Sequence, residues 1–216
     1  MKSRIVLLAS AVALCMPVVA AAQGKAKASA KSKQVQRGEY LVTIGQCNDC
    51  HTPLKMGPTG PEPDMSRMLS GHPQDVKMPP APVKDAAKDL WLISFAATMT
   101  SASGPWGTSF TANLTPDPET GILRDFTEAQ FIATMRTGKH QGQGRAILPP
   151  MPWPNVGKMT DEDLKAVFAY LRQIPAVKNK PPDPIIAPPP GAAPPAGGAA
   201  PAGSPPAGGT PPAPKK

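Results

Sequence analysis

The chain has 216 residues, including 31 prolines and 19 glycines, and a formal net charge of +8. That length predicts one domain of ordinary size with flanking segments. The basic excess lies near the ends, because residues 34–180 hold 15 Lys and Arg against 14 Asp and Glu. The middle shows no basic face with interleaved aromatic residues, so the composition argues against a nucleic-acid partner.

Residues 1–22 are expected to be a secretory signal peptide. A basic start is followed by an apolar run over residues 5–13 and by small residues before Gln23. Leu14 is too bulky to precede a lipidated cysteine, which argues against a lipid anchor on Cys15. No segment reaches about 18 apolar residues, so no transmembrane segment is expected in the mature chain. With no twin arginine, we expect Sec-type export to the periplasm.

Two end segments are expected to lie outside the folded domain. Residues 23–33 carry four lysines and no acidic residue, which indicates a basic flexible arm. Residues 181–216 contain 14 of the 31 prolines and no aromatic residue. A Pro/Ala/Gly-rich segment of this kind cannot bury enough apolar surface to offset its conformational entropy, so a disordered tail is expected. The folded domain is therefore expected over residues 34–180.

Residues 34–46 are expected to form a helix. Tyr40, Ile44 and Cys47 recur at i, i+4 and i+7, with Leu41 beside them, which predicts one apolar face. Gly38 is costly inside a helix. Its presence predicts a close approach by a second helix.

The motif that carries chemistry is Cys47-Asn48-Asp49-Cys50-His51. Cysteines at i and i+3 lie about one helical turn apart, which matches the two vinyl groups at one haem edge. His51 then falls where a proximal axial ligand of the iron is needed. We therefore expect one haem c, attached through two thioethers at Cys47 and Cys50.

Other uses of the two cysteines are weaker. A zinc site needs four ligands, and the mature chain has no second cysteine pair. A thioredoxin-like dithiol expects a βαβ context, which neither flank provides. A plain disulfide between Cys47 and Cys50 would leave His51 without a role.

Met151 is the best candidate for the sixth iron ligand. It lies in Leu148-Pro149-Pro150-Met151-Pro152-Trp153-Pro154, where prolines fix φ and remove amide donors, stiffening the loop. A thioether in such a loop can complete His/Met ligation, with His51 and Met151 on the metal. The alternatives are Met56, Met65, Met68 and Met78, whereas His72 and His140 are expected to be exposed loop residues. Further candidates to hydrogen-bond the haem propionates or the ligand loop are Trp106, Asn113, Arg145 and Trp153.

Two later helices have clear ends. Thr127 is a good N-cap with Gln130 at N3, and that helix should stop at Gly138. Thr160 repeats the arrangement with Asp163. Its helix has apolar residues at i, i+3, i+4 and i+7 and should end before Pro175.

The region between the motif and Thr127 is poor in helix signals. Residues 53–82 hold eight prolines and little periodicity, so a long wrapped loop is expected there. Residues 90–99 are apolar enough for either a short helix or a strand, and residues 115–121 read as a turn.

The order of a helix, the haem motif, loops, a helix, a Pro-Met loop and a last helix resembles a class I monohaem cytochrome c. Closer similarity is to haem domains of cytochrome subunits that serve bacterial membrane-bound alcohol and aldehyde dehydrogenases. The residues that carry it are Arg37–Leu41, Cys47–Pro53, Asn113–Asp117, Thr120–Gly121, Pro149–Trp153, Met159–Leu164 and Ala169–Arg172. The resemblance implies an all-α fold with long Pro-rich loops around one covalent haem, His/Met ligation and periplasmic electron transfer.

From the motif and this resemblance we expect an electron carrier, not an enzyme. It would pass single electrons from a redox protein donor to a redox protein acceptor, for example a dehydrogenase or a terminal oxidase. One alternative is a permanent electron-transfer subunit of a dehydrogenase or oxidase complex, membrane-associated through that partner. The dehydrogenase subunits carry three such domains, whereas this chain has one haem motif, which favours a stand-alone periplasmic monohaem cytochrome over this alternative. Another is a haem enzyme or sensor with an open sixth position.

Overall fold

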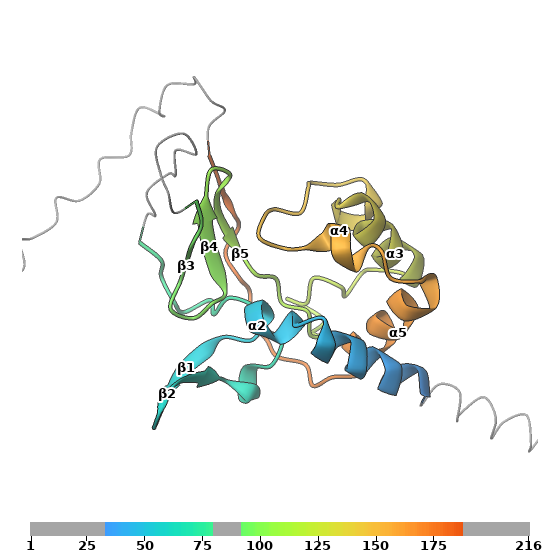
Figure 1. Ribbon diagram of the computed structural model, residues 1–216, viewed down its shortest axis with the longest axis horizontal. Coiled ribbons are helices and arrows are strands. Elements are labelled where there is room, and N and C mark those ends of the chain that lie inside the picture. The colour runs from blue at the N-terminus through green and yellow to red at the C-terminus, as the bar shows by residue number, and fades with distance from the viewer. Residues whose placement is uncertain (1–32, 80–91, 188–216) are drawn as a thin grey trace, which may run out of the picture.

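The computed structural model of the chain describes residues 33–79 and 92–187. Helices gather on one side of the molecule and β-strands on the other (Figure 1). The helices are an N-terminal helix over residues 33–44, α2 (Cys47–His51), α3 (Glu128–Thr137), α4 (Trp153–Val156) and α5 (Asp161–Leu171), with short 3-10 turns η1 (Met65–Arg67) and η2 (His140–Gly142).

The strands form two antiparallel sheets, so the all-α expectation is wrong and the fold is mixed. A hairpin joins β1 (Leu54–Gly57) to β2 (Gly60–Pro63). A second sheet has the order β3 (Ser94–Phe95), β4 (Ser101–Gly104), β5 (Gly107–Phe110) and β6 (Ile185–Ile186). The two sheets occupy the part of the sequence that lacks helix signals, apart from β6.

The β4–β5 hairpin gave little sequence signal because its strands are built from small residues. All of β4, Ser101–Gly104, is buried although only Ala102 is apolar. A Cβ on Gly104 would lie 2.5 Å from Trp106 Cη2, so glycine lets the indole fold back over the strand. The hairpin is buried by its neighbouring strands although its sequence has no alternation of apolar and polar residues. That alternation is the signal by which a strand is recognised in a sequence.

Helices α3 and α5 begin as predicted. The Thr127 hydroxyl accepts from Gln130 N, and the Gln130 side chain accepts from Thr127 N, which completes a capping box. Thr160 Oγ1 accepts from Asp163 N at 3.1 Å. Gly138 ends α3 with a φ of 66°, the left-handed conformation that glycine adopts freely.

The N-terminal helix packs against α5 through Gly38, as predicted. A Cβ at this position would lie 2.6 Å from the Ala166 carbonyl carbon and 2.7 Å from Tyr170 Cβ. The expected apolar face is wrong for two of its residues, however, because Tyr40 and Ile44 are 54% and 55% exposed. Leu41, which was expected on that face, is buried together with Val42, since the helix presents the Gly38 side to α5.

Other segments also differ from the expectations. The loop expected over residues 53–82 contains the β1–β2 hairpin and η1. Residues 94–95 form a strand, which is one of the two alternatives expected for residues 90–99. β6 lies within residues 181–187, which belong to the segment expected to be disordered, and pairs with β5 through Thr108 and Ile185. The expected signal peptide, the arm through residue 32 and the tail beyond residue 187 lie outside the described residues.

The hydrophobic core lies among the N-terminal helix, α3 and α5. Its largest fully buried apolar side chains are Leu69, Leu164 and Val42. Leu69 comes from the loop after η1, so the irregular chain contributes to the core as well. Among the described residues, no helix combines the length and apolar character required to cross a membrane.

We expect Gly38→Ala to destabilise the fold. The added methyl must push the N-terminal helix away from α5, and the packing loss outweighs the gain in helix propensity. A net fall of about 2 kcal/mol in the free energy of unfolding is expected in urea titrations. Gln36→Ala, at an exposed position of the same helix, should change it by less than about 0.5 kcal/mol. Equal effects of the two substitutions would contradict the close approach.

Candidate functional site

The Cys-x-x-Cys-His motif forms its own short helix, α2. Gln46 precedes it with a φ of 56°, a left-handed turn that separates α2 from the N-terminal helix. Cys47 and Cys50 are free, half-buried thiols one helical turn apart. Burial raises the pKa of both thiols, so they are protonated at neutral pH. The arrangement offers two adjacent thiols on one side of a rigid turn.

His51 is buried and held in one tautomer. Its Nδ1 lies 2.9 Å from Ala112 O, and a carbonyl oxygen can only accept, so Nδ1 carries the proton. Burial lowers the pKa of His51, which favours the neutral ring. Nε2 therefore keeps its lone pair, and a neutral imidazole of this kind is a metal ligand.

The end of α2 is anchored to the chain after η1. Thr52 is fully buried, and its hydroxyl donates to Asn48 Oδ1 and accepts from Leu69 N, both at 2.9 Å. Gly71 N donates to His51 O at 2.8 Å. These contacts fix the orientation of α2 and, with it, the direction in which His51 leaves the backbone.

Two buried asparagines hold the segment after β5 that carries Ala112. Asn113 Nδ2 donates to Val177 O at 2.8 Å and to Asn179 O at 3.0 Å, and its Oδ1 accepts from Thr115. Asn179 Nδ2 donates to Ser70 O and His72 O. Because the Asn113 amide is used inside the protein, its suggested contact with a haem propionate is not supported.

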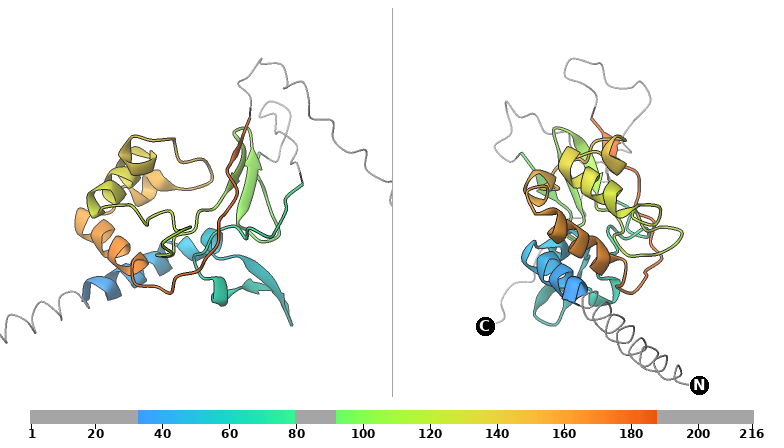
Figure 2. Two further views of the ribbon diagram at one scale, coloured as in Figure 1. Left: turned by 180° about the vertical axis from the view of Figure 1, so that it is seen from behind. Right: turned by 90° about the vertical axis from the view of Figure 1, so that its right-hand side faces the viewer.

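Met151 lies in a loop that leads into α4. Its side chain is half-buried and packs against the same hydrophobic core as Cys47. Met151 N donates to Leu148 O at 3.3 Å, which makes a tight turn across Pro149 and Pro150. Figure 1 and the left view of Figure 2 show this loop reaching from α3 toward the large sheet, above α2. The structure thus brings the Met151 loop and α2 to the same core.

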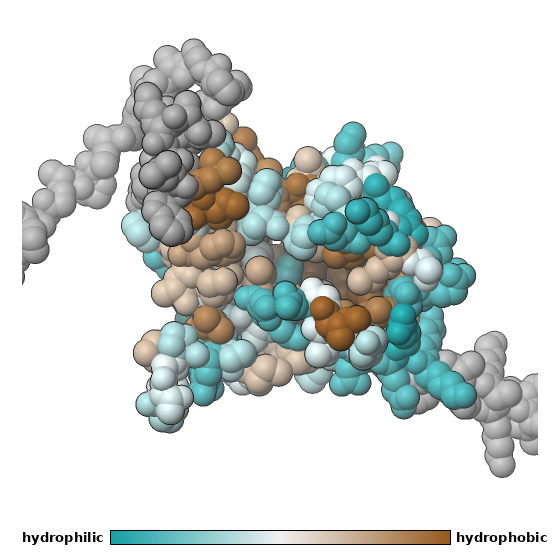
Figure 3. All heavy atoms as spheres, in the orientation of Figure 1, coloured by the Kyte–Doolittle hydropathy of each residue, from teal (hydrophilic) through white to brown (hydrophobic). Residues whose placement is uncertain are grey.

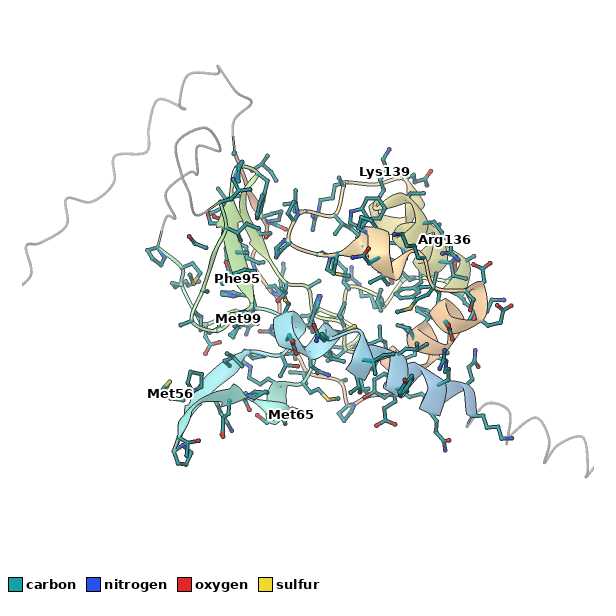
Figure 4. The ribbon with its side chains drawn as sticks, viewed as in Figure 1. Met56, Met65, Phe95, Met99, Arg136 and Lys139 are labelled. Carbon is teal, nitrogen blue, oxygen red and sulfur yellow. The ribbon has the colours of Figure 1, made fainter. Side chains whose placement is uncertain are left out.

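The other candidate methionines lie in less suitable places. Met56 and Met65 are 77% and 59% exposed, and Figure 4 shows Met56 on the β1–β2 hairpin, away from the helices. Met68 and Met78 are half-buried. The sequence reading did not single out Met99, which is half-buried in the turn before β4.

Neither remaining histidine is an exposed loop residue, so that expectation is wrong. His72 is fully buried, with Nε2 donating to Val76 O at 3.2 Å and Nδ1 accepting from Thr100 Oγ1 at 3.0 Å. Both ring nitrogens are therefore engaged. His140 is half-buried against the Phe126 ring, and its Nε2 has no hydrogen-bond partner within the described residues.

Open space adjoins the Met151 loop. A cavity of about 440 Å³ lies between this loop and the β6 segment, lined by Arg145, Ala146, Leu148, Asp183, Pro184 and Ile186. The surface is also hollowed between the large sheet and the α3–α4 side (Figure 3). Trp106 Nε1 is buried and, among the described residues, has no partner. Trp153 instead packs its ring on Gly138, where a Cβ would clash with the ring and lie 2.7 Å from its Cδ2.

The donor set fits a covalently attached haem better than a metal ion. Two thiols one turn apart and an imidazole with a free Nε2 are the groups that such a haem requires. Within residues 33–79 and 92–187, no three His, Cys, Asp or Glu side chains gather as a metal-ion cluster.

Comparison with known proteins identifies relatives of the chain. It is 32% identical over 141 residues to the cytochrome c subunit of a quinone-type alcohol dehydrogenase from Gluconacetobacter polyoxogenes, covering 65% of this chain. The corresponding subunit of Gluconobacter oxydans is 29% identical over 152 residues, or 69% of the chain. A gluconate 2-dehydrogenase cytochrome c subunit of Pantoea cypripedii is 30% identical over 63% of the chain.

The matches cover only part of each relative. The aligned segment is 22% of the Gluconacetobacter subunit, 24% of the Gluconobacter subunit and 22% of the Pantoea subunit. The chain therefore spans less than a quarter of the length of these relatives. No protein-family model matches the chain.

The buried His72 predicts a pH-dependent stability. Burial lowers its pKa from the ordinary 6.5, so the unfolded chain binds a proton that the folded chain refuses. The free energy of unfolding should therefore fall as the pH drops from about 7 toward the lowered pKa of His72. His72→Gln should flatten this fall by up to about 1.4 kcal/mol per pH unit in urea titrations. Parallel pH profiles of the two proteins would contradict it.

Proposed function

Because the chain is homologous to the cytochrome c subunits of alcohol and gluconate dehydrogenases, we propose that it transfers single electrons through one haem c. Cys47 and Cys50 would attach the haem, and His51 and Met151 would bind its iron. The observation that carries the proposal is the hydrogen bond from His51 Nδ1 to Ala112 O inside the Cys-x-x-Cys-His turn. It leaves Nε2 free for iron and orients the ring.

The residues of the site have distinct tasks. α2 holds both thiols on one turn, and Thr52 and Gly71 keep that turn in place. A haem bound there supplies a one-electron couple between ferric and ferrous iron. The Ala112 carbonyl, as partner of the ligating imidazole, increases its basicity, and a thioether ligand raises the reduction potential.

Met151 is favoured as the sixth ligand by its surroundings. It is half-buried against the core that Cys47 also touches, whereas Met56 and Met65 face the solvent. His72 has both nitrogens engaged, so it has no lone pair to offer. Met68, Met78, Met99 and His140 are the other half-buried candidates, and experiment separates them from Met151.

We propose that the electron donor is a dehydrogenase and that the chain acts as its electron-transfer subunit. The relatives named above are cytochrome c subunits of dehydrogenases, which supports this role over a freely diffusing carrier. The proposed place of action is the periplasm, after export through the Sec route.

Substitution of Met151 tests the ligand. The protein should show covalent haem in a pyridine haemochrome assay. Its ferric form should show the far-red absorption band of an iron–methionine bond. Met151→Ala should lose this band, lower the reduction potential and bind carbon monoxide readily when reduced. Met56→Ala, Met68→Ala, Met78→Ala and Met99→Ala should keep the band. A wild-type protein without the band, or loss of the band in Met99→Ala alone, would exclude Met151.

Isolation of the native protein tests the partner. After mild solubilisation of its host's membranes, the haem protein should elute together with a dehydrogenase, and that enzyme's substrate should reduce the haem. A haem protein that elutes alone, and that no co-isolated dehydrogenase reduces, would instead be a free carrier.

A further inference from the structure

We propose that Ser109 is a positioning residue for the Met151 loop, and that residues 109–112 brace the segments of both axial ligands. The inference rests on the proposed His51/Met151 ligation. Ser109 lies on β5, whereas the haem motif lies on α2 and the ligand loop joins α3 to α4. One short stretch of chain therefore reaches both sides of the proposed site.

The contact to the Met151 loop is a hydrogen bond from a side chain to the backbone. Ser109 Oγ lies 2.7 Å from Pro149 O and 3.3 Å from Ala102 O. A hydroxyl has one proton, so it donates to the nearer oxygen, Pro149 O. Pro149 is two residues before Met151, close enough for this bond to set the course of the loop into the ligand.

The loop has few other ways to be held. Pro149, Pro150 and Pro152 have no N–H, so their amides cannot anchor it. Within the described residues, Met151 N bonds only inside the loop, to Leu148 O, and the Ser109 bond is what joins residues 148–151 to another element. The sheet thus supplies an anchor that the proline-rich backbone cannot make.

The other end of the loop is already fixed. The Trp153 ring of α4 packs on Gly138 at the end of α3, and a Cβ on Gly157 would press on Met135 O. Arg136 donates to Gly157 O and, at 2.6 Å, to Asp161 Oδ1, and so joins α3, the end of α4 and the start of α5 (Figure 4). Movement of Met151 is therefore limited on its C-terminal side by α3, and on its N-terminal side by Ser109 together with the bond from Ile147 N to Gly138 O at 2.8 Å.

The same segment reaches His51 three residues later. Ala112 O accepts from His51 Nδ1 at 2.9 Å. Three residues of extended chain span about 10 Å, so Ser109 and Ala112 can serve opposite sides of one group. Pairing of Ser109 with Ala102 fixes the register of β5, and Asn113 fixes the other end through Val177 and Asn179. The segment is held at both ends, as a brace requires.

Loss of the Ser109 hydroxyl should let the loop release Met151 more often. An external ligand then binds ferric iron faster, because it needs Met151 to leave first. In Ser109→Ala, cyanide binding followed by stopped flow should speed up about fivefold, the factor that matches the net worth of one hydrogen bond. The far-red band should weaken as well. Ser109→Thr keeps the hydroxyl and should behave as the wild type.

Ser103→Ala is the matched control. Ser103 is a buried serine on the neighbouring strand β4, and its hydroxyl accepts only from Thr108 Oγ1, at 3.5 Å, among the described contacts. It should leave both the cyanide rate and the far-red band unchanged, even if the unfolding midpoint falls as far as in Ser109→Ala. A rate increase in Ser103→Ala equal to that in Ser109→Ala would reduce Ser109 to a general stabiliser of the sheet.

The outcomes separate this inference from the function it rests on. A wild-type protein without the far-red band would overturn Met151 ligation and, with it, the task given to Ser109. A wild type with the band, whose Ser109→Ala variant has the same band and the same cyanide rate, would overturn the positioning role alone. Failure of Ser109→Thr to restore the wild-type rate would also overturn it.

Discussion

The hydrogen bonds of two buried asparagines hold together segments that have almost no regular structure. Asn179 donates to Ser70 O and His72 O, and accepts from Gln74 N and Arg67 Nη2, so all four of its bonds are made. Asn113 joins the 113–120 turn to the same C-terminal stretch. An unpaired amide buried here would lower the free energy of unfolding by about 1–3 kcal/mol. Residues 70–74, the 113–120 turn and the stretch around Asn179 must therefore keep their relative positions.

This constraint extends to the proposed haem site, because Ala112 is the neighbour of Asn113. The Ala112 carbonyl can orient His51 only while the chain on either side of it stays fixed. Asn113 supplies one end and the β4–β5 register supplies the other. The large sheet, which the resemblance to helical haem domains did not predict, therefore has a role in the proposed site. Its strand β5 and the residues that follow contact both proposed ligand segments, because Ser109 donates to Pro149 O and Ala112 O accepts from His51.

The relatives and the geometry support different parts of the functional proposal. Similarity to dehydrogenase cytochrome c subunits points to electron transfer and to the kind of partner. The geometry concerns the site: a neutral, oriented imidazole, two thiols on one turn, and a methionine loop packed on the same core. Because the chain spans less than a quarter of the length of those relatives, the proposed dehydrogenase partner is inferred from similarity to that part of them.

The sequence by itself determined the local features: the Cys-x-x-Cys-His turn, the caps at Thr127 and Thr160, and the close approach at Gly38. Each depends on residues within a few positions of one another, or on one residue without a side chain. Only the tertiary structure decided the sheet, the burial of His72 and the exposure of Tyr40 and Ile44. It also revealed the bond from Ser109 to Pro149. Those features depend on which distant segment covers a residue. Serine and glycine are too small and polar to produce a hydrophobic periodicity, so the sequence does not indicate the segment with which they pair.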